Sequence, residues 1–128
     1  VAGRHLPIIR AAGYKPTAIA FTWIKLRPRE PDSPFLYPRS SFNFGPGLTT
    51  RKGTEVCVLA RRGSPKRLST SVRELIIAPR REHSRKPDEF YERVRQYAAG
   101  PYLELFSRQQ RAGWTCWGNE VGKFSEAA

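Results

Sequence analysis

The sequence predicts an α/β fold, and three observations support this prediction. Residues 4–13, "RHLPIIRAAG", have the apolar spacing of a short helix and stop at a glycine. Residues 17–26, "TAIAFTWIKL", follow as an apolar run rich in β-branched and aromatic residues, which is typical of a buried strand. Farther along, 74–79 and 102–106 are short apolar runs separated by a helical segment. A helix between two strands joins neighbours that run parallel, so we expect several parallel strands.

The helix between the last two runs has clear start and stop signals. Pro87 suits the first helical position, and the two acidic residues after it complement the positive end of the helix dipole. Phe90, Val94 and Tyr97 form one apolar stripe, and a Gly-Pro pair ends the segment. The sequence therefore predicts a surface helix with one face on the core.

Two further strands and one long loop complete the predicted fold. The strands are expected at 55–63, "EVCVLARRG", and at 113–121, "GWTCWGNEV". Residues 27–53 are rich in proline and glycine and predict a long irregular loop, which in compact domains is usually functional or disordered. Within it, "FNFGPG" at 42–47 resembles a glycine-rich cofactor loop. It neither follows an apolar strand nor opens a helix, so we interpret it as part of the loop.

Length and composition limit the class of protein. A chain of 128 residues suits one domain, here 1–128, and no apolar run approaches the length of a membrane span. Cys57 and Cys116 lack paired spacing, which favours reduced thiols in a cytoplasmic protein. His5 and His83 are equally isolated, so we expect no metal site.

The charge of the chain points to a phosphate-rich partner. The net charge is +12, and residues 51–85 hold ten basic residues against three acidic ones, a balance of +7. A basic segment of this kind is the usual electrostatic signature of a nucleic-acid-binding surface. The alternative is a solvated arginine-rich face without a partner.

Two charged residues stand out individually. Lys86 lies at the beginning of the predicted helix, where free backbone N–H groups already favour an anion such as a carboxylate or phosphate. The alternative is an ordinary surface lysine. Glu104 lies inside the apolar run 102–106, and a carboxylate there needs a partner if it is buried. Alternation places Tyr102, Glu104 and Phe106 on one face, so a half-exposed edge strand remains the alternative.

Polar residues follow each of the last two predicted strands. They are Ser107, Arg108, Gln109 and Gln110 after the first, and Asn119 and Glu120 after the second. In open α/β sheets, ligands bind beyond the carboxyl ends of the strands. Because both strand ends lie near a basic helix beginning, they predict a site for a ligand that carries a nucleoside.

Several motifs in combination resemble one family. "REHSRKPDEFYERV", "GPYLELFSRQQRAGW" and "WGNE" look like the C-terminal half of the N-6-adenine methyltransferases. "AIAFTWIKL" and "TRKGTEVCVLARRGSPKR" are similar to the middle of the bacterial and phage DNA adenine methylases of that family. The resemblance covers roughly residues 5–121. It implies a Rossmann-like three-layer α/β/α methyltransferase fold, incomplete at its N-terminus, and S-adenosylmethionine as the cofactor.

The resemblance also implies roles for individual residues. Lys86, with Ser84 beside it, would meet the methionine end of the cofactor and pair with its carboxylate. The other implied cofactor contacts are Phe106 and Arg108 at the strand end, Gln110 near the ribose, and Asn119 and Glu120 on the ribose and adenine. Glu104 would stand behind the pocket without touching the cofactor.

The same resemblance implies a nucleic-acid-facing surface. It would comprise the insertion at 27–53 and the basic segment through Arg51, Arg61 and Arg62. It also implies a reaction without a metal ion.

The catalytic signature of the family, Asp-Pro-Pro followed by an aromatic residue, has no match in the sequence. "EPDSPF" at 30–35 has the wrong order and position. The signature matters because the exocyclic amine of adenine is a weak nucleophile that must be oriented by hydrogen-bond acceptors while the base is stacked.

We therefore interpret the chain as the C-terminal fragment of an S-adenosylmethionine-dependent adenine N-6 methyltransferase. We expect it to act on DNA rather than RNA and to be inactive alone. One alternative is a non-catalytic basic nucleic-acid-binding module. Another is an inactive subunit that forms a homo- or heterodimer with an intact methyltransferase.

Overall fold

The computed structural model describes residues 3–28, 42–43, 45–47 and 49–124. The elements in chain order are α1 (His5–Ala11), β1 (Lys15–Leu26), β2 (Thr54–Arg61), β3 (Leu75–Pro79), α2 (Asp88–Tyr97), β4 (Tyr102–Leu105) and β5 (Trp114–Trp117). Each corresponds to a helix or strand that the sequence predicts, so the mixed α/β class is confirmed. Most of the predicted loop 27–53 lies outside the described residues.

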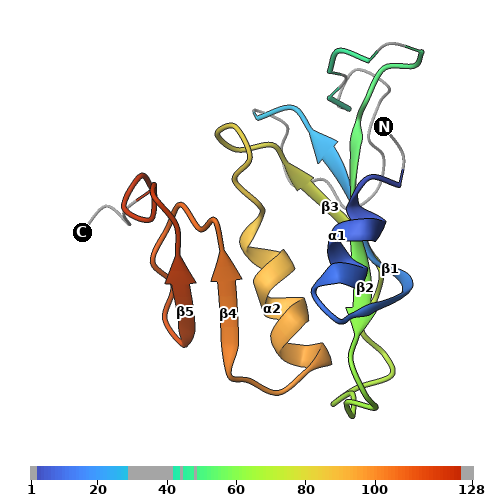
Figure 1. The fold of residues 1–128 in the computed structure, drawn as a ribbon. Helices are drawn as coiled ribbons and strands as arrows, with labels where there is room; N and C mark the ends of the chain where they lie inside the picture. Colours follow the sequence, from blue (N-terminus) through green and yellow to red (C-terminus); the bar gives the residue numbers. More distant parts are fainter. Residues whose placement is uncertain (1–2, 29–41, 44, 48, 125–128) are drawn as a thin grey trace.

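The strands form two small sheets with α2 between them (Figure 1). One sheet has the order β2-β1-β3, in which β1 runs antiparallel to β2 and parallel to β3. The other pairs β4 with β5 in parallel. The predicted parallel pairs and the helix between two strands are thus confirmed, but the strands that α2 joins, β3 and β4, lie in different sheets and are not neighbours. A three-layer fold has one sheet covered by helices on both faces, and the described residues do not form that arrangement.

The three-stranded sheet packs on one face of α2. Phe21 and Trp23 alternate onto the same face of β1, and Ile76 of β3 lies next to them in a fully buried position. Phe90 and Val94 of α2 pack against this cluster, and the rings of Phe21 and Phe90 meet edge to face at 5.6 Å. This contact confirms the predicted apolar stripe for those two helix residues.

A second face of α2 packs on the two-stranded sheet. Tyr91 is buried, and its ring meets that of Trp114 edge to face at 5.3 Å. Trp114 in turn stacks on Tyr102 at 4.8 Å. Tyr91 directly follows Phe90 and so points about 100° away around the helix. α2 therefore has apolar residues on two faces and lies between two sheets. The sequence predicted only one apolar stripe on this helix.

The last strand is shorter than predicted. β5 ends at Trp117, whereas the sequence predicted a strand to residue 121. Gly118 passes so close to the preceding strand end that a Cβ there would lie 2.6 Å from the carbonyl oxygen of Ser107. The chain then turns, with the Val121 amide donating to the Gly118 carbonyl at 3.3 Å. Asn119 and Glu120 therefore lie in a turn beyond the strand.

Both sheets leave apolar side chains exposed on the face away from α2. Leu103 and Leu105 of β4 are 59% and 56% exposed, and Val56 of β2 is 54% exposed. Leu75 and Ile77 of β3 are also exposed. In the described part of the chain, neither helix is long and apolar enough to cross a membrane.

Candidate functional site

The polar residues singled out in the sequence gather at one end of the molecule. β1, β3, β4 and β5 all point their carboxyl ends the same way (Figure 1). Two adjoining cavities open there, of about 230 Å³ and about 380 Å³. They share Phe106, Ser107 and Arg108 in their walls. This is the edge at which open α/β sheets bind ligands.

Lys86 lies in the wall of the first cavity and forms an ion pair with Glu55 of β2, in the three-stranded sheet. Its ammonium group donates a hydrogen bond to one carboxylate oxygen of Glu55, and Lys25 donates to the other at 2.8 Å. Burial alone would raise the pKa of Glu55, but the hydrogen bonds from the two lysines outweigh it and hold the pKa below its ordinary value. Glu55 therefore stays ionised and fixes the direction of Lys86. An ammonium group has three donors, which leaves Lys86 able to bind a further anion.

Acidification is expected to remove the stabilising contribution of Glu55. The pKa of Glu55 in the folded state lies below the ordinary value of 4.5, so this contribution is fully present above about that pH. It is lost as the pH falls through the lowered folded-state pKa. We expect wild type to have a higher urea midpoint than Glu55→Gln at pH 7, and the difference to shrink as the pH falls below 4.5. A difference that stays constant throughout acidification would contradict this role.

Arg108 connects three segments at the edge of the first cavity. Its guanidinium donates to the His83 carbonyl at 2.9 Å and pairs with the Glu120 carboxylate at 2.8 Å. The hydrogen bond from Lys123, and then the charge of Arg108, hold the pKa of Glu120 below its ordinary value. The Arg108 carbonyl also accepts from the Phe124 amide at 2.9 Å. Arg108 thus ties the segment before α2 to the turn after β5.

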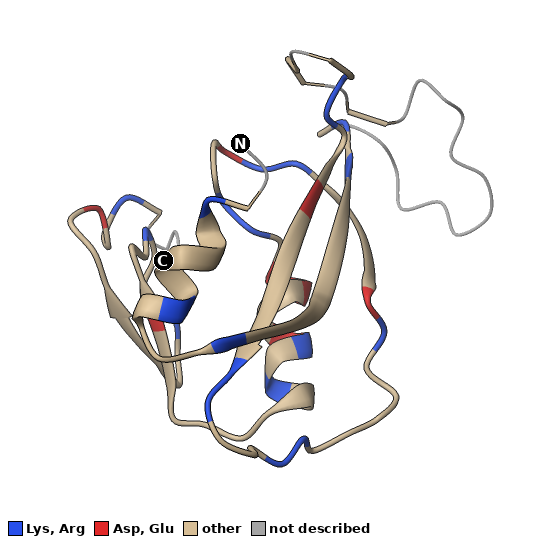
Figure 2. Cartoon of the chain, turned by 45° about the vertical axis from the view of Figure 1, so that its right-hand side comes forward, with Lys and Arg blue, Asp and Glu red and all other residues tan. Residues whose placement is uncertain are grey.

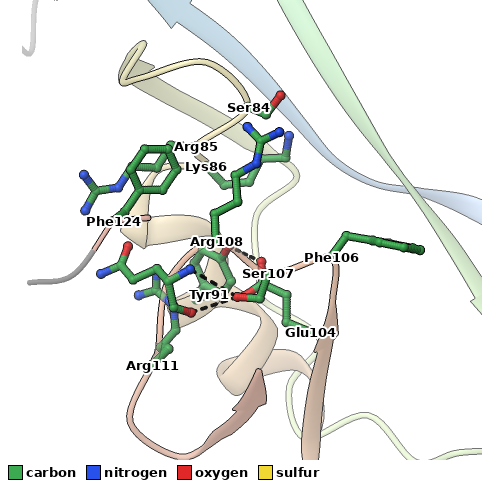
Figure 3. Close-up of a pocket in the computed structure, with 11 residues that line it drawn as sticks. Ser84, Arg85, Lys86, Tyr91, Glu104, Phe106, Ser107, Arg108, Arg111 and Phe124 are labelled. Atoms are coloured by element: carbon green, nitrogen blue, oxygen red, sulfur yellow. Dashed lines mark hydrogen bonds between the residues drawn. The ribbon is translucent and has the colours of Figure 1, made fainter. Parts of the chain in front are cut away.

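Glu104 points into the molecule, toward α2, and the neighbouring leucines point out. Its carboxylate accepts from the Tyr91 hydroxyl at 2.7 Å and from the Ser107 hydroxyl at 3.1 Å (Figure 3). Burial and the bond to Glu104 both raise the pKa of Tyr91, which keeps its hydroxyl protonated as a donor. β4 is an edge strand and Glu104 is partly buried, as the half-exposed alternative had it, but the carboxylate also has hydrogen-bond partners inside the molecule. Glu104 joins α2 to the turn that carries Phe106 and Arg108.

Two residues that line the first cavity have left-handed backbone conformations. They are Ser84, with φ of 65°, and Phe106, with φ of 59°. Neither is a glycine, so each conformation costs about 1–3 kcal/mol, and residues that carry such strain are often found at functional sites. The ring of Phe106 is 81% exposed and points away from the other labelled side chains (Figure 3). It meets Trp117 edge to face at 6.1 Å.

Most of the predicted cofactor residues line these cavities. Ser84, Lys86, Phe106 and Arg108 line the first, and Phe106, Arg108, Asn119 and Glu120 line the second. Glu104, predicted to stand behind the pocket, also lies in the wall of the first. Gln110 is exposed and lines neither. Its neighbour Gln109 is buried in the wall, and its side-chain oxygen has no hydrogen-bond partner among the described residues.

The predicted nucleic-acid residues lie at the two ends of β2. Arg51 precedes the strand, on the side of the cavities, whereas Arg61 ends it and Arg62 follows. The eight residues of β2 separate the two groups by roughly 23 Å at about 3.3 Å per residue. The single predicted basic surface is therefore divided. Among the described residues, no group of three histidine, cysteine, aspartate or glutamate side chains could hold a metal ion.

Comparison with known proteins matches most of the chain to one family. The sequence model of the MT-A70 family matches residues 18–120. The human N(6)-adenine-specific methyltransferase METTL4 is 46% identical over 52 residues, which cover 39% of this chain and 11% of that protein. The N6-methyladenosine RNA methyltransferase MTA1 of Cryphonectria parasitica is 40% identical over 83 residues, which cover 62% of this chain and 24% of that protein. The chain thus spans less than a quarter of the length of each of these two relatives.

Proposed function

Because the chain belongs to the MT-A70 family, we propose that it forms the cofactor-binding part of an S-adenosylmethionine-dependent methyltransferase. The proposed target is N-6 of adenine in nucleic acid, which agrees with the names of both relatives. The observation that carries the proposal is that Lys86 and Arg108 line one cavity at the carboxyl ends of the strands. In the complete enzyme these strands would belong to a Rossmann-like sheet, as the family implies.

The residues present suit the charged end of S-adenosylmethionine. The cofactor carries a carboxylate and an ammonium group on its methionine part. Lys86 is fixed by Glu55 and retains donors for the carboxylate. The unpartnered oxygen of Gln109 is an acceptor in the same wall, of the kind that an ammonium group requires. The cavity therefore offers a cationic donor for the carboxylate, Lys86, and an acceptor for the ammonium group, Gln109.

The second cavity suits the nucleoside end. Asn119 and Glu120 are exposed there and offer an amide and a carboxylate to ribose hydroxyls and adenine. Phe106 and Trp117 supply aromatic surface beside them. Arg108 holds Glu120 in place through the 2.8 Å ion pair. Because Arg108 and Phe106 line both cavities, one elongated ligand would contact both.

Bound S-adenosylmethionine would supply an electrophilic methyl group, and a second set of residues must present the amine of adenine. The sequence contains no Asp-Pro-Pro-aromatic motif to do so. We therefore propose that the chain alone binds the cofactor without transferring its methyl group. We favour DNA as the substrate of the complete enzyme, on the resemblance of 18–26 and 50–67 to bacterial and phage DNA methylases. The name of the fungal relative supports RNA as the alternative.

The test combines titration calorimetry with a transfer assay. S-adenosylmethionine is expected to bind with a stoichiometry of one, whereas tritiated cofactor is expected to leave no label on adenine-containing DNA or RNA. Label on either polymer would contradict inactivity and identify the substrate. A folded chain that binds no cofactor at millimolar concentration would contradict the proposal itself.

Phe106→Gly is expected to affect stability and cofactor binding differently. Glycine adopts the left-handed backbone without the usual cost of about 1–2 kcal/mol, which offsets its own entropic cost of about 0.5–1 kcal/mol. We therefore expect the urea midpoint to be unchanged or raised, while cofactor affinity falls because the ring is lost. Phe106→Ala is the matched control, since it removes the ring and keeps the strain. Equal cofactor affinity in wild type and both variants would show that Phe106 does not contact the ligand.

The exposed apolar faces favour one other role. Leu103, Leu105 and Val56 are each more than half exposed, as expected of a surface that packs against further protein. An inactive subunit that pairs with an intact methyltransferase would have such a surface. Size-exclusion chromatography with and without a full-length relative distinguishes this role from cofactor binding by an isolated chain.

A further inference from the structure

The end of the molecule opposite the cavities carries a second basic cluster. In Figure 2, blue segments mark the lower end of the β1–β2 pair and the loop that follows it. We call this cluster the far basic surface. It comprises the exposed residues Arg10, Lys15, Arg61, Arg62, Lys66 and Arg67.

The fold brings these residues together from three segments. Lys15 of β1 pairs in register with Arg61 of β2. A Cβ added at Gly13 would lie 3.9 Å from the Arg62 side chain. The turn after α1 therefore lies beside the end of β2. The loop after β2 is held at the C-terminal end of α2, because the Leu68 amide donates to the Tyr97 carbonyl at 2.8 Å.

The positive charge of this surface is not neutralised by the described residues. The sequence has no aspartate or glutamate in 3–28 or in 56–73, the two stretches that supply all six side chains. The ion pairs of the described part involve other cations, mostly at the cavity end. Six exposed cations without a paired acid form a strong site for a polyanion.

The chemistry of the surface favours phosphodiesters. Four of its six cations are arginines, whose guanidinium fork matches a phosphate with two parallel hydrogen bonds. Tyr14 lies in the middle, 42% exposed, with the Arg62 guanidinium 5.4 Å from its ring centre. An exposed aromatic ring among cations is also the arrangement on which unpaired bases stack.

We propose that the far basic surface binds the phosphate backbone of a nucleic acid, separately from the cavities. This proposal rests on the proposed function only for the identification of the polyanion as a nucleic acid. Arg51 and Lys52 mark the cavity end of β2, roughly 23 Å away by strand length. A single strand that contacts both ends must span about seven nucleotides at about 3.4 Å each. The far basic surface would thus hold the polymer while its other end reaches the cavities.

The test is fluorescence anisotropy with labelled single-stranded oligonucleotides of 4 and 20 nucleotides, as DNA and as RNA of one sequence. The test variant is Arg61→Gln with Arg62→Gln, and a comparison variant at the cavity end of β2 is Arg51→Gln with Lys52→Gln. Both remove two exposed charges beside the same strand. We expect the Arg61/Arg62 variant to bind the 20-mer more weakly, on the order of tenfold. The slope of log affinity against log salt concentration should become shallower by roughly 1.4, which corresponds to two lost phosphate contacts on a single strand. The 4-mer is expected to bind weakly to all forms.

Each outcome decides the proposal. Equal affinity of wild type and the Arg61/Arg62 variant for the 20-mer overturns it, as does equal competition by polyglutamate of the same charge. A larger loss on DNA than on RNA, or the reverse, supports it and identifies the polymer. Titration with S-adenosylmethionine separates this proposal from the proposed function, because the Arg61/Arg62 variant must bind the cofactor as wild type does. A chain that binds no cofactor yet loses oligonucleotide affinity in that variant supports this surface and contradicts only the proposed function.

Discussion

Lys86→Ala is expected to weaken binding of S-adenosylmethionine by between tenfold and a hundredfold. A hydrogen bond to a charged group contributes about 1.5–3 kcal/mol, and each 1.4 kcal/mol is a factor of ten in affinity. Lys86 lines the first cavity, and Glu55 fixes its direction. Because the side chain is already ordered in the free protein, ligand binding does not incur the entropic cost of ordering it. Titration calorimetry measures the change directly.

Lys25→Ala is the matched control for that prediction. Lys25 pairs with the other oxygen of Glu55 at 2.8 Å and carries the same charge, but it does not line the first cavity. We expect its replacement to change cofactor affinity less than threefold, while urea midpoints monitor the effect of each variant on folding. Equal losses in both variants would show that the net charge of the cluster matters and that Lys86 does not contact the ligand.

Glu104→Ala is expected to lower the free energy of unfolding by roughly 2–4 kcal/mol. The substitution leaves the Tyr91 and Ser107 hydroxyls without their carboxylate partner, and each such buried group costs about 1–3 kcal/mol. Ser107 is fully buried and retains an acceptor in the Gln109 carbonyl at 2.8 Å, so Tyr91 bears more of the loss. Urea unfolding followed by tryptophan fluorescence measures the effect.

A double-mutant cycle identifies the cause of that loss. Tyr91→Phe removes only the hydroxyl, and its effect should not add to that of Glu104→Ala if the two act through one hydrogen bond. Glu92→Ala, on the exposed side of α2, is expected to change stability by less than about 0.5 kcal/mol. Additive effects of the Tyr91 and Glu104 substitutions would contradict the proposed network.

Local signals in the sequence predicted the elements well. The Pro-Asp-Glu run marks the beginning of α2 to within one residue, with Pro87 preceding the helix that starts at Asp88. β-branched and aromatic runs likewise located the strands. Lys86, Arg108 and Glu120 line cavities at the carboxyl ends of the strands, and a ligand site there stays a prediction.

The contacts that local signals could not predict are those between distant segments. Glu55 reaches Lys86 across 31 positions, and nothing near either residue indicates the pair. The orientation of Glu104 depends on Tyr91, because alternation along a strand defines two faces without saying which one is covered. Gln109 rather than Gln110 enters the wall because the chain turns at Phe106, where strand alternation no longer applies. The meeting of Lys15 with Arg61 follows from the antiparallel pairing of β1 with β2.

The most direct test of the central claim is a residue-resolved titration. We would follow the backbone amide signals of isotope-labelled chain by nuclear magnetic resonance as S-adenosylmethionine is added. The account predicts that the largest shifts fall at 84–86, 106–109 and 117–120, with signals at 61–68 unchanged. Shifts centred on 61–68, or no shifts in a folded chain at millimolar cofactor, would contradict a cofactor site at the carboxyl ends of the strands.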